Sequence, residues 1–238
     1  MVKLEILSIF AILLFSASCS FAGDPSDSCI CNSGGSLFDL PSLDMIPTKV
    51  GNYEFPKSIE IPQNITPPAD QEFKFYLVCS GYSWHRCVNK TWIFEESRAL
   101  FFNNEEDISC YPRSASAVTV KNAAAPQGTV SLGIGSIIPE YDTSRLITTA
   151  IVTIPKSNKN DIPLGLEKTS NNAGKGAFED VTYIVRPKTK GGNTPTIPCG
   201  NEQFPEGYIH SRPFILYNLF YHPKKGSSKV YRRSYRQQ

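Results

Sequence analysis

Residues 146 to 154 read LITTAIVTI, a run in which β-branched side chains predominate. Such side chains fit the pleated surface of a strand and lose rotamer freedom in a helix, so the run predicts a β-strand. Clusters of turn-forming residues follow it along the chain: KSNKND (156–161), SNNAGKG (170–176) and TKGGNTP (189–195). Short strands interrupted this often are typical of an antiparallel sandwich or barrel.

The preceding part of the chain has the same character. Alternate residues between 73 and 79 are apolar, which places them on one face of a strand: Phe73, Phe75, Leu77 and Cys79. Further strands are expected at 86–94, 108–111, 129–134, 178–186 and 214–221. A short helix is expected near 93–103, where Glu95, Glu96, Arg98, Ala99 and Leu100 are good helix formers. We therefore predict an all-β fold with little helix: an antiparallel, β-sandwich-like, disulfide-stapled protein.

Two short resemblances to extracellular modules fit that class. The phrase LVCSG, with Trp92 thirteen positions after Cys79, is similar to the start of an immunoglobulin-type sandwich, but Cys110 follows too soon to leave room for the intervening strands. CSGY and CVNKTW together resemble the second half of a sushi module, with a narrower cysteine spacing and a later closing cysteine. Each resemblance covers fewer than thirty-five residues, so neither identifies a family.

The first 22 residues have the layout of a secretory signal peptide. Lys3 precedes an apolar run, and small residues lead to a cleavage site after Ala22. The run is too short to cross a bilayer comfortably, so we expect a secreted, extracellular protein with no transmembrane span. The remaining chain divides into a cysteine-rich β region (23–120), a β-rich region (128–223) and a basic disordered tail (224–238).

Six cysteines remain after signal cleavage, and an even number in an oxidising compartment predicts three disulfides. If all are paired, Cys199 must bond back to one of the five that precede it, which ties the second region to the first. Sequence does not decide the connectivity of this set: Cys29, Cys31, Cys79, Cys87, Cys110 and Cys199.

Two Asn-x-Thr triplets are acceptors for N-glycosylation in a secreted chain. Asn89-Lys90-Thr91 is the stronger candidate, because Pro67 directly follows the second triplet, Asn64-Ile65-Thr66. An occupied Asn89 would lie at the surface.

The formal net charge of +2 conceals an uneven distribution. The last fifteen residues contain six basic side chains and no acid, which leaves the rest of the chain acidic overall and argues against nucleic acid as a partner. The tail could bind an anionic glycan or lipid, serve only solubility, or be removed by processing. Its basic residues are Lys224, Lys225, Lys229, Arg232, Arg233 and Arg236.

Catalytic and metal-binding motifs are absent from the sequence. The chain has three histidines and no H-E-x-x-H pattern, and a ligand set of Cys79, His85 and Cys87 lacks the second close pair that a structural zinc site uses. No catalytic residue, metal or cofactor is therefore predicted. A hydrolase that uses two carboxylates stays open as an alternative, because that pairing is spatial; the acids are Glu95, Glu96, Glu105, Glu106, Asp107, Glu140, Asp142, Glu179 and Asp180.

The resulting hypothesis is a secreted, non-catalytic glycoprotein that binds a protein or glycan at a cell surface or in the extracellular matrix. The alternatives are the carboxylate hydrolase and a precursor of basic C-terminal peptides. An intact C-terminus at Gln238 in the native secretion would contradict the precursor.

Overall fold

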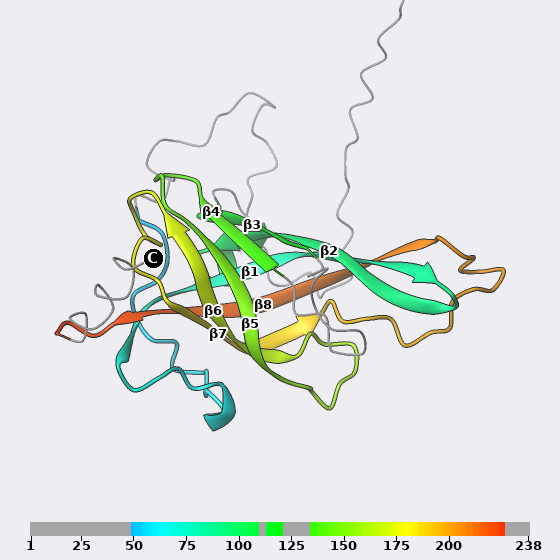
Figure 1. Cartoon of the computed structure of the whole chain (residues 1–238), viewed down its shortest axis with the longest axis horizontal. Coiled ribbons are helices and arrows are strands. Elements are labelled where there is room, and N and C mark those ends of the chain that lie inside the picture. Colours follow the sequence, from blue (N-terminus) through cyan, green and yellow to red (C-terminus); the bar gives the residue numbers. More distant parts are fainter. Residues whose placement is uncertain (1–48, 110–112, 121–133, 227–238) are drawn as a thin grey trace, which may run out of the picture. The chain divides into compact units, whose positions relative to one another are not determined.

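The structure is a computed structural model and describes residues 49–109, 113–120 and 134–226. Helix in this part of the chain is limited to two short 3-10 turns, η2 (Gln63–Ile65) and η3 (Glu106–Ser109). Strands make up the rest of the regular structure (Figure 1). Their bounds are β1 (Gln71–Val88), β2 (Thr91–Phe102), β3 (Ala115–Val120), β4 (Ile134–Pro139), β5 (Arg145–Ile154), β6 (Leu164–Ala173), β7 (Tyr183–Gly191) and β8 (Ile209–Pro223).

The eight strands form one closed antiparallel barrel in which each strand pairs with the next along the chain. Closure comes from the pairing of β1 with β8, which runs from Gln71 opposite Pro223 to Arg86 opposite Ile209. The prediction of a β-sandwich is therefore wrong, although the all-β, antiparallel class is right. Alternation of apolar residues identifies the buried face of a strand, but the same alternation serves two packed sheets and one sheet closed on itself.

The helix expected near 93–103 is also wrong, because these residues lie in β2. This strand pairs with β1 over its whole length and with β3 from Glu96 to Phe101. Helix propensity differs by less than about 1 kcal/mol per residue among ordinary side chains. Ladder hydrogen bonds on both sides of the strand and the burial of Ala99 and Phe101 outweigh that preference.

A bulge changes the predicted face of one residue in β1. Phe73 lies opposite Tyr221 and Phe75 lies opposite Phe220, so Lys74 is the extra residue between them. Phe75, Leu77 and Cys79 point into the barrel, as their alternation predicts, whereas Phe73 packs on the outer side with Tyr221. One inserted residue is enough to exchange the two faces of a strand.

Aromatic rings fill the end of the barrel near the start of β1. Phe75 and Phe220 stack with their ring centroids 4.8 Å apart, and Phe178, from the connection between β6 and β7, lies 5.3 Å from Phe220. All three are fully buried. Gly51 passes directly over Phe75 with a φ of +89°, and a Cβ there would lie 2.3 Å from the ring. The segment around Gly51 therefore completes this end of the core.

One side of the barrel is covered on its outer surface by residues from the segment that precedes β1. Ile59 and Ile65 are buried against apolar side chains that point outward from the sheet. Residues of this outer cluster come from β1, β6, β7 and β8: Val78, Leu166, Val185, Tyr217, Leu219 and Tyr221. Within the described ranges, the barrel thus has its second apolar layer on this side.

Phe220 is the residue that joins the aromatic end of the core to the closing pair of strands. We expect Phe220→Ala to lower the free energy of unfolding by about 3 to 5 kcal/mol, because it removes a fully buried ring and leaves a cavity. Val118→Ala, at an exposed position of β3, should change it by less than about 0.5 kcal/mol. Urea denaturation followed by circular dichroism measures both, and equal effects would contradict this account of the core.

Candidate functional site

Strands β1, β2 and β8 continue beyond their neighbours and form a three-stranded ribbon, residues 82–96 and 209–213. Pairing of β2 with β3 ends at Glu96 opposite Val120, and pairing of β7 with β8 ends at Gly191 opposite Phe214. Past these points, among the described strands, the three pair only with one another, and they project from the barrel in Figure 1. The ribbon therefore has two faces that the rest of the sheet does not cover.

The hairpin that joins β1 to β2 turns at Asn89 and Lys90, whose φ angles are 51° and 61°. Two left-handed residues in a two-residue loop are the signature of a type I′ turn, and asparagine adopts that conformation readily. The carboxylate of Glu206 accepts a hydrogen bond from the backbone N–H of Asn89 at 2.6 Å. Asn89 is exposed, as is Asn64 on η2, so both acceptor asparagines lie at the surface; their glycosylation stays a prediction.

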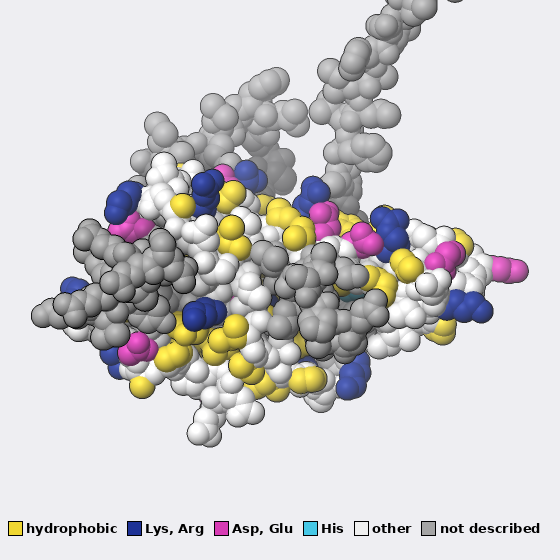
Figure 2. Space-filling model, in the orientation of Figure 1, with side chains coloured by type: hydrophobic (Ala, Val, Ile, Leu, Met, Phe, Trp, Pro, Cys, Tyr) yellow, Lys and Arg dark blue, Asp and Glu magenta, His cyan; other side chains and the backbone are white. Residues whose placement is uncertain are grey.

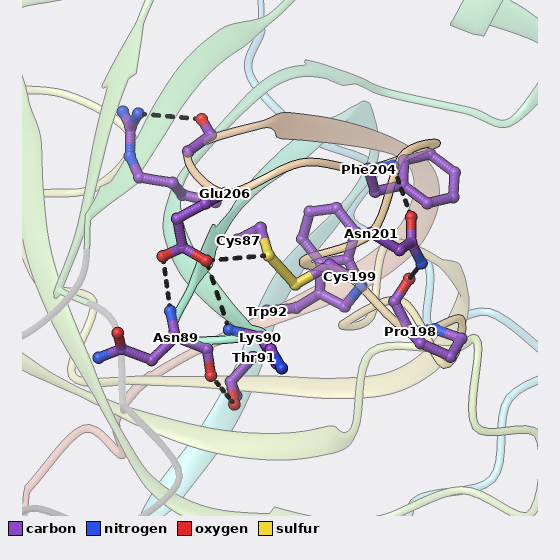
Figure 3. The surroundings of a disulfide bond; sticks show 12 residues. Cys87, Asn89, Lys90, Thr91, Trp92, Pro198, Cys199, Asn201, Phe204 and Glu206 are labelled. Atoms are coloured by element: carbon purple, nitrogen blue, oxygen red, sulfur yellow. Dashed lines mark hydrogen bonds between the residues drawn. A yellow bond between two sulfur atoms is a disulfide. The ribbon is translucent and has the colours of Figure 1, made fainter.

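A disulfide between Cys87 and Cys199 holds the connection between β7 and β8 against the ribbon (Figure 3). Both cysteines are buried, and Trp92 and Phe204 pack around them. The indole N–H of Trp92 also donates to the carbonyl of Ile197 at 2.8 Å. Cys199 therefore bonds back to the first cysteine-containing region, and residues 193–208, the disulfide lobe, cover one face of the ribbon.

Cys79 is unpaired, contrary to the expectation that all six mature cysteines form disulfides. It points into the barrel, where burial is the main cause that raises the pKa of its thiol. The interior near it also holds an ion pair between Arg186 and Glu167, 2.8 Å apart, with Thr148 donating to the same carboxylate. Because Cys79 is on the inward-facing side of β1, it lies away from the exposed loops, where another cysteine could form a disulfide with it. Cys29, Cys31 and Cys110 lie outside the described residues.

The inner face of the ribbon carries a cluster of potentially cationic side chains. His85 lies directly opposite His210 across the β1–β8 pair, and Arg212 lies opposite Ser83, the next inward residue. Burial first, and then the charges of Arg212 and His210, lowers the pKa of His85 to about 4. Burial and Arg212 also lower the pKa of His210. We call His85, His210 and Arg212 the cationic cluster.

Sequence reasoning missed this cluster because His85 is more than a hundred residues away from His210 and Arg212 in the chain. The alternation of Ser83, His85 and Cys87 would have marked His85 as inward-facing, but nothing in the sequence shows that His210 lies opposite. The ligand set of Cys79, His85 and Cys87 is not assembled, because Cys87 is in the disulfide. Among the described residues, no group of three or more His, Cys, Asp or Glu side chains could hold a metal ion.

Most of the acids proposed for a hydrolase are held in ion pairs with cations. Glu95 and Glu96 pair with Arg86 and Arg98 at 3.0 and 3.1 Å. Others form pairs at the opposite end of the barrel: Glu140 with Arg113, Glu179 with Lys175 and Asp180 with Lys74. Asp142 instead accepts hydrogen bonds from Ser144 and from the backbone of Ala177. Glu105 accepts a hydrogen bond from the hydroxyl of Tyr217 and lies 3.9 Å from the ammonium of Lys188.

The outer face of β1 to β5 exposes large apolar side chains next to one another. Val118 of β3 faces outward between Arg98 and Ser136, and the row continues to Tyr82 on one side and Ile147 on the other. We call this surface the uncovered face, and each of its large apolar members is between 37% and 51% exposed: Tyr82, Leu100, Val118, Val120, Ile138, Ile147 and Ile151. Figure 2 shows apolar side chains at the surface of the molecule in the view of Figure 1.

Only the first part of the basic tail is described. Lys224 donates to the carbonyl of Ala69 at 2.7 Å, and its backbone N–H donates to Asp70, so it extends the closing strand pair. Lys225 is exposed. The remaining basic residues, Lys229, Arg232, Arg233 and Arg236, lie outside the described residues. Within the described ranges, no helix is long and apolar enough to cross a membrane.

Comparisons of this chain with protein-family models, with curated proteins and with solved structures find no match.

The state of Cys79 can be tested directly by alkylation. Because the thiol is buried inside the barrel and its pKa is raised, we expect iodoacetamide to leave Cys79 unmodified in the native protein. Addition of denaturant without reductant should expose it to complete labelling, whereas Cys87 and Cys199 should react only after reduction. Peptide mass spectrometry reads all three sites, and a Cys79 that stays blocked in denaturant would show that it is disulfide-bonded.

His85 makes stability depend on pH. Its pKa of about 4 is below that of an unfolded histidine, so the unfolded chain binds more protons and the free energy of unfolding falls as the pH drops from about 6.5 towards 4. The slope is at most about 1.4 kcal/mol per pH unit. Thermal unfolding of the wild type and of His85→Gln between pH 7 and pH 4.5 isolates this contribution. Parallel curves for the two proteins would contradict it.

Proposed function

We propose that this protein is a secreted, non-catalytic binding protein whose uncovered face contacts an extracellular protein partner. One observation carries the proposal: the barrel's outer surface is apolar on both sides, but within the described residues the covering side chains, Ile59 and Ile65, lie on the side of β6 to β8. Soluble proteins seldom leave a contiguous apolar patch exposed unless it serves an interaction.

The composition of the uncovered face favours a protein over a glycan or lipid. Its rows of apolar residues are interspersed with small hydroxyl side chains such as Ser116 and Ser136. Its charged residues include Arg98 and Glu96, which form an ion pair at 3.1 Å, and the exposed Arg145, which lies on the same face of β5 as Ile147. A sulfated glycan or an anionic membrane surface would need an excess of cations. An apolar patch with little net charge instead fits a partner surface that is itself apolar and rich in aromatic side chains.

Binding through the folded uncovered face can be distinguished from electrostatic adhesion through the basic tail. Contacts between apolar surfaces persist at high salt, whereas attraction between exposed charges is screened within about 10 Å at 0.1 M salt. None of the residues that define the uncovered face belongs to the tail. Binding through the uncovered face should therefore survive both salt and removal of the residues after Pro223.

The test is binding of the mature chain to cells and matrix from the source organism, beside Val118→Lys and Ile147→Lys. Each substitution places a charge in the centre of the uncovered face at a side chain that is already exposed, so the fold should be retained. We expect saturable binding that persists at 0.5 M salt and is weakened at least about tenfold by either substitution, because a buried unpaired charge costs more than about 1.4 kcal/mol.

Gln63→Lys, on the exposed surface of η2, is the matched control because it adds the same charge away from the face. Circular dichroism confirms folding of each variant. Unchanged binding of both face variants would overturn the proposal, as would binding that disappears with salt or with the tail. Sedimentation of the wild type must also show a monomer, since a dimer that Val118→Lys dissociates would mean that a second copy occupies the face.

A further inference from the structure

The uncovered face continues from the barrel onto the outer face of the ribbon. Tyr82 lies opposite Arg98, and Arg98 lies opposite Val118, so one row of outward side chains crosses from β1 to β3. Trp84 is the next outward residue of β1, because side chains two apart in a strand point to the same face. The disulfide lobe covers the inner face of the ribbon, whereas Ile209 on the outer face is 46% exposed.

Four outward side chains lie next to one another where the ribbon meets the barrel, and we call them the ribbon patch: Tyr82, Trp84, Glu96 and Arg98. The ring centroids of Tyr82 and Trp84 are 6.3 Å apart, and the guanidinium carbon of Arg98 lies 6.0 Å from the Trp84 ring. Each side chain restricts the rotamers of its neighbours, so a partner that binds here loses little free energy in ordering them. Trp, Tyr and Arg are also the residues that most often dominate the binding free energy of an interface.

The ion pair within the ribbon patch leaves Arg98 able to bind a second carboxylate. The side chain of Arg98 is 65% exposed and that of Glu96 is 34% exposed, and ion pairs this accessible contribute little to stability. Glu96 contacts Nη2 of Arg98, which leaves Nε and Nη1 of the guanidinium as further donors. A partner carboxylate can therefore bind Arg98 beside Glu96 or in its place.

The charges of the uncovered face favour an acidic partner. Arg98 and Arg145 are both exposed, and Glu96 is the acid beside them. In the described part of the chain, Arg145 forms no ion pair with a carboxylate. Two cations and one acid leave an excess of positive charge, which attracts a partner surface that carries carboxylates.

We infer that the partner of the uncovered face is an acidic protein: one of its carboxylates binds Arg98, and an apolar side chain beside that carboxylate packs on Tyr82 and Trp84. The inference rests on the proposed function, because it names the chemistry of the same partner. A guanidinium binds a carboxylate through paired N–H donors, and the neighbouring rings offer contact area to the apolar side chain. The apolar residues of the face hold the partner, while the charges select it and speed its association.

The test uses the same cells and matrix, and it compares Arg98→Gln with Glu96→Gln in affinity and association rate. An acidic partner predicts effects of opposite sign. We expect Arg98→Gln to weaken binding by about tenfold and to slow association at low salt, whereas Glu96→Gln removes a repelling charge and should tighten binding by about threefold. Lys175→Gln and Glu179→Gln are the matched controls, because this exposed ion pair lies outside the uncovered face.

Trp84→Ala tests the aromatic part of the ribbon patch. We expect it to weaken binding by about tenfold or more, because the partner's apolar side chain loses the ring on which it packs. Phe55→Ala is its control, since Phe55 is 42% exposed and packs on Phe73 at the covered side of the barrel. Soluble heparin, which offers negative charge without apolar contact area, should not compete at equal ionic strength.

Any result other than weaker binding of Arg98→Gln and tighter binding of Glu96→Gln overturns the inference, as does competition by heparin. A Trp84→Ala variant that binds as tightly as Phe55→Ala overturns it too. In each of these cases, weaker binding of Val118→Lys would leave the proposed function standing. Arg98 and Glu96 lie at the surface, so the two charge variants should keep the fold, and circular dichroism checks this.

Discussion

The pairing of β1 with β8 is the interaction on which the rest of this structure depends. It joins the first and last strands, and it contains the residues that link the interior of the barrel to its outer layer: Phe75 and Phe220 face inward, while Val78 and Leu219 face outward. Such a contact is entropically expensive to form, because almost the whole sheet lies between the two strands. Once the pair has formed, neither strand leaves a free edge of the sheet.

The same pair of strands creates the ribbon, because β1 and β8 are longer than the strands beside them. Beyond the barrel, a ribbon of three strands encloses no core of its own. The Cys87–Cys199 disulfide adds stability that packing of the ribbon alone does not provide. It links positions 112 residues apart and holds the disulfide lobe with its aromatic side chains on the inner face. In the chain-entropy account a link of this span stabilises the fold by about 4 to 5 kcal/mol.

The two sides of the barrel differ in what the chain does with its outward apolar residues. On one side the segment around η2 covers them and adds to the stability of the fold; on the other they stay half exposed. Covering the exposed half of a side chain such as Ile138 would contribute about half of the ~1.5 to 3 kcal/mol that full burial gives. That difference links the architecture to the proposed function, because a partner that covers the uncovered face would recover this free energy.

The sequence alone predicted features that depend on local pattern. The β-branched run at 146–154 lies in β5 and the aromatic stretch at 214–221 lies in β8. The strand expected at 86–94 is instead divided by the turn at Asn89-Lys90. Sequence also required that Cys199 bond back towards the N-terminal half if it is paired, which the Cys87 bond fulfils. Four features were decided only by the tertiary structure: the closed barrel, the unpaired Cys79, the strand in place of a helix at 91–102, and the position of His85 opposite His210. Each of these features depends on which strands are neighbours and on bulges that shift the inward and outward positions of a strand by one residue. The free energies of such long-range pairings cannot be read from the periodicity of any single segment.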